Sequence, residues 1–372
     1  MSTQNNHSAE VIKTDIAIIG GGNAGITLAT KLKHQTAVVI EPKTPEQRDA
    51  SWALWAKSDT QQDLAFATKG QWHQWRLIDH HSEIIHSSEQ YHYLSLCSRD
   101  YLRHCENKLS PNISLIRSTA DNIVGVGTGG TFVAENQQYI ADFIYDSRPA
   151  QLDENGLKQH FFGIEIRTKA PIKDRHIATL MDFRVDQSRG LHFIYALPFS
   201  DHSLLIESTV ISTTLESKDW YRKAIYQWLD QQSIEIDQVT REEYGVIPMH
   251  KTTPIDHSLT SIGAASGAVR LSSGYAFTNI QAQIKQLAEC IDRGEFQVPQ
   301  VISGNISKLD QIYNGVLIDN PELGVELMMK TAGALDADGF SRFMLGTATF
   351  KDWIRVILAM PKIPFLAQVF RL

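Results

Sequence analysis

One acidic residue interrupts an apolar stretch in the middle of the chain. Glu207 lies within residues 203–212, where leucine and β-branched side chains predict a β-strand. Because side chains alternate along a strand, Leu205, Glu207 and Thr209 share one face. A carboxyl group on such a face either meets solvent or lies in a cavity, where desolvation raises its pKa and lets it act as a general acid near neutral pH.

A second acid, Asp182, lies in the apolar segment 180–183 and allows the same two interpretations. Arg184 is two residues further on and therefore on the same face of a strand, so an ion pair between the two is the structural alternative. We predict Glu207 and Asp182 as the catalytic acids.

Near the start of the chain, an apolar run ends abruptly in closely spaced glycines. Residues 16–19 predict a buried parallel strand and residues 26–32 an amphipathic helix. The glycines between them allow a tight turn, let the backbone approach a pyrophosphate, and let the helix pack closely on the strand. The predicted phosphate-binding residues of this turn and of the first helical turn are Gly20, Gly22, Asn23, Ala24 and Gly25.

A second predicted strand, residues 37–40, ends in Glu41. This acid lies about 20 residues past the first glycine, where a carboxylate accepts hydrogen bonds from the ribose of an adenine dinucleotide. The alternative is a glycine turn in some other α/β unit. The N-terminal position of the motif is typical of FAD enzymes, in which a later segment of the chain closes over the flavin.

Three later segments fit that second contact with the nucleotide. The predicted strand 139–145 ends in Asp146, as expected for a return to the nucleotide sheet. Residues 260–267 form a strand that turns into small residues, including Gly263, and Gly274 and Tyr275 lead into a long helix ending near residue 291. The N-terminus of that helix is expected near the flavin.

Two tryptophans follow the nucleotide unit, and an apolar segment ends the chain. Trp52 and Trp55 are candidates for the wall of an apolar substrate site, with ordinary core packing as the alternative. Residues 350–360 are apolar with interspersed bases, and residues 361–372 continue that character. Such an end lies either in a membrane interface or against its own domain.

Composition limits the partners. The 372 residues are 42% apolar and carry 35 basic and 42 acidic side chains, a formal charge of −7 without a basic tract, so we expect no nucleic-acid partner. The three cysteines form no C-x-x-C pair, which favours reduced thiols in a cytoplasmic setting. The histidines show no metal-ligand spacing, so no metal is expected. Residues 1–13 are polar, so we expect no signal peptide, and no run reaches the ~20 apolar residues of a membrane span.

Taken in order, several segments resemble the bacterial lycopene β-cyclases, flavoproteins of carotenoid biosynthesis, over nearly the whole chain. Besides the glycine motif and Glu41, the resemblance rests on residues 51–55, 145–149, 159–163, 180–184, 193–198, 205–209, 245–248 and 273–275. It departs from the family at Ala50-Ser51, where a polar pair such as His-Thr is usual, and at residues 270–272, where proline is usual.

The resemblance implies a fold and a reaction. The fold is α/β: a FAD-binding Rossmann-like domain of the glutathione-reductase type, an inserted β-rich substrate domain and a helical C-terminal region. The reaction is a redox-neutral cyclisation of the linear ends of lycopene to β-ionone rings, with reduced FAD and with NADPH as electron donor. Glu207 matches the family's acid/base residue, and Trp52 and Trp55 would stabilise a carbocation. The substrate would be a hydrophobic carotenoid, met by a cytoplasmic protein at the inner membrane surface.

We divide the chain into a first FAD-binding part at 1–85, a mixed sheet and substrate domain at 86–250, a second FAD-binding part at 251–300, and a helical region at 301–372. Two other functions stay open. One is a FAD-dependent monooxygenase or prenyl reductase acting on another polyene or isoprenoid. The other is a non-catalytic nucleotide-binding or lipid-carrier protein. The sequence indicates no oligomeric state.

Overall fold

The computed structural model describes residues 11–58 and 60–371, and most of the polar start of the chain lies outside them. A first sheet is built on β1 (Ile12–Ile19), which pairs in parallel with β2 (Ala37–Ile40) and with β11 (Gln137–Asp146). The sheet has the order β8-β2-β1-β11-β10-β9, and β17 adds to β11. Its other strands are β8 (Ile113–Ile116), β9 (Asp121–Val126), β10 (Gly129–Ala134) and β17 (Thr260–Ser261).

A second sheet is longer and mostly antiparallel, with the order β16-β12-β15-β14-β13-β5-β6. Its strands are β5 (Gln74–Ile78), β6 (Glu83–Ser87), β12 (Lys158–Thr168), β13 (Ile177–Asp182), β14 (Leu191–Pro198), β15 (Ser203–Ser212) and β16 (Ile236–Pro248). A third sheet has the order β3-β7-β4, with β3 (Ser51–Lys57), β7 (Tyr91–Cys97) and β4 (Thr68–Trp72).

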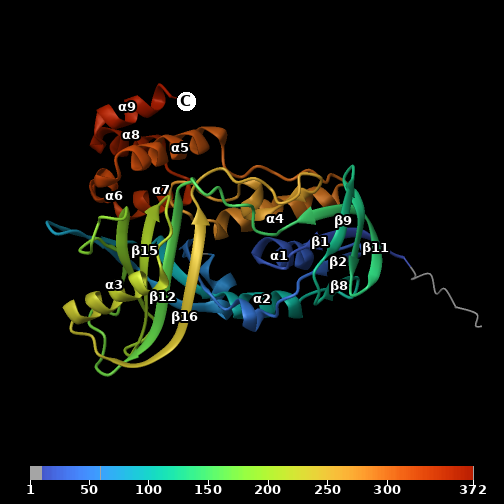
Figure 1. The fold of residues 1–372 in the computed structure, drawn as a ribbon, viewed down its shortest axis with the longest axis horizontal. Coiled ribbons are helices and arrows are strands. Elements are labelled where there is room, and N and C mark those ends of the chain that lie inside the picture. Colours follow the sequence, from blue (N-terminus) through green and yellow to red (C-terminus); the bar gives the residue numbers. More distant parts are fainter. Residues whose placement is uncertain (1–10, 59, 372) are drawn as a thin grey trace, which may run out of the picture.

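The helices divide between these sheets (Figure 1). α1 (Asn23–Lys31) packs with α4 (Phe277–Asp292) beside the first sheet, and α2 (Ser98–Asn107) contacts α1. α3 (Lys218–Gln231) packs on one face of the second sheet. The C-terminal helices gather at one end of that sheet in Figure 1, and they are α5 (Gly304–Asp319), α6 (Gly324–Ala334), α7 (Ala337–Leu345), α8 (Phe350–Ala359) and α9 (Lys362–Val369).

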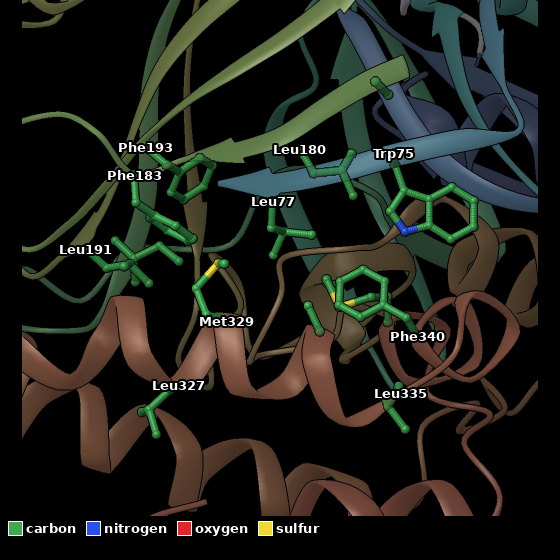
Figure 2. Packing of buried hydrophobic residues seen from close by; sticks show 14 of the residues in the cluster. Trp75, Leu77, Leu180, Phe183, Leu191, Phe193, Leu327, Met329, Leu335 and Phe340 are labelled. Carbon is green, nitrogen blue, oxygen red and sulfur yellow. The ribbon is translucent and has the colours of Figure 1, made fainter. Parts of the chain in front are cut away.

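The two faces of β15 pack against different partners, as strand alternation predicts. Leu204 and Ile206 join the cluster that α3 covers, whereas Leu205 belongs to the cluster under the C-terminal helices. Figure 2 shows this second cluster, with Met329 of α6 pointing toward Leu77 and Phe193 of the sheet. Glu207 therefore lies on the face that looks away from α3.

The sheets do not follow the division of the chain at residue 85. β5 and β6 precede or span this boundary but pair within the second sheet, and β8 to β10 follow it but belong to the first. Residues 304–369 are mainly helical, as predicted for the C-terminal region. In the described part of the chain, no helix is both long enough and apolar enough to cross a bilayer.

Candidate active site

A cavity of about 810 Å³ lies between the second sheet, the glycine turn and the C-terminal helices. Asn23 of α1 and Ala264 line its inner end, and Glu207 of β15 lies on its wall. Ile357 of α8 and Leu366 of α9 line its outer end, and both are about half exposed, at 53% each. The cavity therefore connects the predicted cofactor and acid sites to the protein surface between α8 and α9.

Glu207 is buried, with 8% of its surface exposed, and a second carboxyl group lies close to it. On β12, Gly163 is paired with Glu207 on one side and with Glu243 of β16 on the other. A β-carbon on Gly163 would come within 2.7 Å of Cγ of Glu207 and 3.3 Å of Cγ of Glu243. The missing side chain thus leaves the space in which the two carboxyl groups meet.

The pKa of Glu207 lies well above its ordinary value. Burial is the main cause, because it disfavours the charged form. The negative charge of Glu243 and a hydrogen bond with it raise the pKa further, while the Arg241 guanidinium acts in the opposite direction. Burial and the neighbouring carboxyl group therefore favour the protonated form of Glu207.

Three tyrosine hydroxyl groups lie beside this acid. The hydroxyl of Tyr93 is 2.9 Å from that of Tyr195 and 3.0 Å from that of Tyr275, and all three residues line the cavity. Tyr195 pairs directly with Glu207 across β14 and β15. Burial raises the pKa of Tyr275 to about 12, and the pKa values of Tyr93 and Tyr195 also rise, so these hydroxyls stay neutral. They offer oxygen dipoles to a cavity that is otherwise mainly apolar.

Asp182 does not lie in the cavity, contrary to our prediction of a second catalytic acid. Its carboxylate is fully buried, accepts a 2.9 Å hydrogen bond from the Trp228 indole of α3, and forms a 2.6 Å ion pair with Arg184. Burial acts to raise its pKa, but the hydrogen bonds from Arg184 and Trp228 lower it below the ordinary value. The second sheet separates this ion pair from Glu207, so Asp182 has a structural role.

Of the two tryptophans predicted to line a substrate site, only Trp52 lines the cavity. Trp52 lines the cavity and contacts Phe277 at the start of α4, with ring centroids 6.0 Å apart. Trp55 is 1% exposed and packs against Trp75 and Tyr93 in the core. An interval of three residues puts two side chains on opposite faces of a strand, which is why β3 cannot present both to the cavity.

The glycine turn has the shape of a phosphate cradle. Gly20 has φ +97°, and a β-carbon on Gly25 would lie 2.0 Å from the Gly20 carbonyl oxygen, so neither position suits a larger residue. A β-carbon on Gly22 would meet open space. Gly22 is the N-cap of α1, so no N-cap side chain accepts a hydrogen bond from the first backbone N–H groups of the helix. These residues fit a dinucleotide whose pyrophosphate lies at the helix N-terminus.

Glu41 lies at the end of β2, directly beside this turn. Its carboxylate accepts hydrogen bonds of 2.9 Å from the backbone N–H groups of Gly21 and Lys43. Arg48 lies 3.3 Å from Glu41 and donates to the Gly21 carbonyl oxygen at 2.6 Å. Our sequence reasoning missed Arg48, because it ends a short 3-10 helix (Pro45–Arg48) that carries no recognised motif.

Of the late segments, the one that carries Gly263 lies against α1, and the part of the others in cofactor binding stays a prediction. Gly263, with φ +73°, lies so close to α1 that a β-carbon would be 2.7 Å from that of Ala24. Gly274, with φ +72°, and Tyr275 line the cavity just before α4. Asp146 ends β11 beside β1, where both of its carboxylate oxygens accept hydrogen bonds from Arg148, and its part in cofactor binding stays a prediction.

Arg270 explains the departure at residues 270–272. It is 1% exposed and donates to both carboxylate oxygens of Asp310 on α5, at 2.9 and 2.8 Å, and to the Phe343 carbonyl oxygen. This buried ion pair ties the loop before α4 to the C-terminal helices. Sequence reasoning missed it because 40 residues separate the two partners.

The α/β fold is shared with solved proteins that include a reductase-like protein and a halogenase in complex with FAD. The chain is similar to a geranylgeranyl bacteriochlorophyll reductase-like protein from Thermoplasma acidophilum, with 13% identity over 97% of this chain and 100% of that one and a TM-score of 0.64. It is also similar to a mutant of the halogenase PltM in complex with FAD, with 11% identity over 95% and 87% of the chains and a TM-score of 0.57.

The family model described as "Lycopene cyclase protein" matches residues 15–369, so the chain belongs to the lycopene cyclase family. It is 24% identical to the chloroplastic neoxanthin synthase of Solanum tuberosum over 75% of this chain and 61% of that protein. It is 25% identical to the lycopene beta-cyclase of Pantoea ananas over 57% and 58% of the two chains. The chain thus spans about three fifths of the length of these relatives. The family predicted from the sequence is confirmed.

Proposed function

We propose that this protein is a FAD-dependent lycopene β-cyclase, which converts the linear ends of lycopene to β-ionone rings and so forms γ- or β-carotene. One observation carries the proposal: in a chain of the lycopene cyclase family, a buried glutamic acid with a raised pKa lies on the wall of an apolar cavity. Glu207 is that acid. Its cavity reaches the glycine turn on one side and the surface on the other.

In the proposed reaction, the Glu207 carboxyl group transfers its proton to the terminal double bond of the substrate. The resulting carbocation is attacked by a neighbouring double bond of the same molecule, which closes the ring. The Glu207 carboxylate then accepts a proton from the ring, and the C=C bond of the β-ionone ring forms. Atoms and electrons balance without an external oxidant or reductant, so the product is an isomer of the substrate.

Two groups of side chains support the cationic stage. The faces of Trp52 and of the tyrosines attract a cation through their ring quadrupoles. The hydroxyl oxygens of Tyr93, Tyr195 and Tyr275 add dipoles in a site that excludes water. Because the cavity wall is mainly apolar, these interactions are stronger than they would be in water.

The cradle formed by Gly20, Gly22 and Gly25, with Glu41 beside it, would hold FAD, and Gly263 and Gly274 would close over it from the later segments. Bound reduced FAD would supply negative charge that stabilises a nearby cation, and NADPH is the proposed electron donor. The fit of the cradle and the likeness to a halogenase complexed with FAD support this assignment.

We also propose that α8 and α9 bind the inner surface of the cytoplasmic membrane, where a carotenoid is dissolved. These two helices and the residue that follows them expose large apolar side chains around the outer end of the cavity: Phe350, Ile354, Ile357, Leu358, Ile363, Leu366, Val369 and Phe370. Basic residues lie among them in the sequence: Lys351, Arg355, Lys362 and Arg371. This combination suits an interface with anionic lipid.

Expression in a lycopene-accumulating bacterium tests the function. We expect red lycopene to be converted to γ- or β-carotene, purified protein to carry a flavin spectrum, and Glu207→Gln to keep the flavin but lose conversion. Asp182→Asn is the matched control, since that acid lies across the sheet and should retain conversion when the protein folds. Unchanged lycopene with flavin-loaded protein would contradict the cyclase, and net NAD(P)H consumption on another isoprenoid would favour a reductase or monooxygenase.

A further inference from the structure

The second carboxyl group beside Glu207 is fixed much more firmly than Glu207 itself. Glu243 accepts hydrogen bonds from Arg241 at 2.9 and 3.3 Å and from the Ser51 backbone N–H at 3.0 Å, and its side chain is 6% exposed. Hydrogen bonds from a guanidinium are among the stronger ones in proteins, so these donors hold the Glu243 carboxyl group in place beside Glu207.

Arg241 is itself anchored from several sides. Its guanidinium lies 3.2 Å from Glu165 of β12 and donates to the Ser51 hydroxyl at 2.7 Å. Glu165 in turn pairs with Lys69 of β4 at 2.6 Å. The network connects the second sheet with β3 and β4, so the position of Glu243 depends on strands of two sheets.

We propose that Glu243 is a positioning residue for the proton of Glu207: as a carboxylate held by Arg241, it accepts a hydrogen bond from the protonated acid over Gly163 and so fixes its carboxyl group at the cavity wall. The inference rests on the proposed function of Glu207 as the acid. It assigns a role to the glycine as well, because any side chain on Gly163 would enter the space between the two carboxyl groups.

The other groups facing Glu207 do not compete for this role. Tyr195 on the neighbouring strand and Tyr275 before α4 are neutral, since burial raises the pKa of each. The Thr209 hydroxyl lies two residues along the same face and has no partner among the described side chains and backbone groups. The charged groups are therefore Glu243 and Arg241, with Glu165 and Lys69 behind them, and removal of the Glu243 charge lowers the pKa of Glu207.

The pH profile of lycopene conversion by the flavin-loaded full chain tests the positioning role. Because the acid form of Glu207 is required, activity falls as pH rises through its pKa. We expect Glu243→Gln to shift this alkaline limb to lower pH, whereas Glu243→Asp, which keeps the carboxyl group, should leave the limb close to its position in the parent protein. Glu242→Gln is the matched control, because Glu242 is the adjacent acid of β16 but pairs with Arg222 at the surface. Equal profiles for Glu243→Gln and Glu242→Gln would overturn the proposal.

A second readout does not depend on the substrate. The infrared C=O band of protonated Glu207, identified by its loss in Glu207→Gln, should disappear at lower pH in Glu243→Gln than in the parent protein. A shift without lycopene conversion would support the proposed role of Glu243 and contradict the proposed function. Conversion without the shift would contradict the role of Glu243. Should Glu243→Gln not fold, the double variant Arg241→Gln with Glu243→Gln removes both charges. It should shift the band in the same direction, since the effect of Glu243 on Glu207 exceeds that of Arg241. An unshifted band in the double variant would overturn the proposed role of Glu243.

Discussion

At the scale of single residues, the fold favours the protonated form of Glu207, whereas exposure to water favours the ionised form. In the unfolded chain its carboxyl group ionises near its ordinary pKa, whereas in the folded chain the pKa is raised by burial and by Glu243. The folded state therefore binds one more proton than the unfolded state between these two pKa values. Stability from this proton is fully present below the ordinary pKa and is lost as pH rises through the raised one.

We therefore expect Glu207→Gln to stabilise the protein relative to the parent increasingly as pH rises. The amide keeps the size of the acid but has no proton to lose, so the difference in Tm should be larger near about pH 9 than near about pH 5. Thermal unfolding of both proteins across this range gives the measurement. Asp182→Asn is the control with the opposite sign: its pKa is lowered in the fold, so its charge contributes stability above the ordinary value that is lost as pH falls. A Tm difference for Glu207→Gln that does not change with pH would contradict the raised pKa.

At the scale of elements, the loop before α4 and helix α5 are held together by buried polar groups instead of apolar packing alone. Arg270 and Asp310 form an ion pair in which both side chains are at most 3% exposed. Asn314, one turn further along α5, donates to the carbonyl oxygens of Met249 and Leu271 at 2.7 Å. The same loop carries Gly274 and Tyr275, so the C-terminal helices help to set the shape of the proposed flavin site.

Asp310→Asn should therefore destabilise the protein strongly. It leaves the Arg270 guanidinium buried with an uncompensated charge, which costs about 3–5 kcal/mol in free energy of unfolding. Denaturant unfolding with a flavin fluorescence probe gives both stability and cofactor retention. Asp292→Asn is the control, because its partner Lys33 is 65% exposed and such a pair is worth about 0–1 kcal/mol. Similar losses of unfolding free energy in the two variants would show that the buried ion pair contributes no more to stability than the exposed one.

At the scale of the whole molecule, the proposed membrane surface and the cavity opening coincide. Ile363 and Phe370 are 83% and 87% exposed at the α9 end, and Ile357, half exposed, belongs to the cavity lining. Val126 is also exposed, at 71%, but lies on β9 in the first sheet, far from α9 in Figure 1. A single exposed apolar side chain therefore does not indicate the proposed membrane surface. The concentration of such side chains at the cavity opening does.

The double variant Ile363→Glu with Phe370→Glu should bind anionic lipid vesicles at least about tenfold more weakly. Each side chain contributes about 1.5–3 kcal/mol when it is fully buried in an apolar phase, and 1.4 kcal/mol corresponds to a factor of ten. Its folding stability should change by less than about 1 kcal/mol, because both sites are at the surface. Vesicle co-sedimentation gives the affinity, and Val126→Glu is the control. Equal loss for the control, or unchanged binding of the double variant, would contradict the proposed orientation.

Local periodicity was sufficient for the elements that an apolar run and its flanking glycines mark in the sequence. It placed β1, α1 and β2 with Glu41 at the end, and the alternation in β15 placed Glu207 on one face with Leu205 and Thr209. It was insufficient where pairing across the sheet decides. The structural role of Asp182 could not be predicted without the position of Trp228. The contact of Glu207 with Glu243 could not be predicted without the register of β12, in which Gly163 lies between them.

The opening of the cavity between α8 and α9 has a kinetic consequence under the proposed function. A long symmetric polyene reaches Glu207 with one end, while its other end points back toward the bilayer. Before the second ring can form, the one-ring product must withdraw, reverse and enter again, in competition with every unreacted chain dissolved nearby. Catalysis would then be distributive: the one-ring pigment passes through a maximum, whose height depends on how much unreacted pigment the membrane holds.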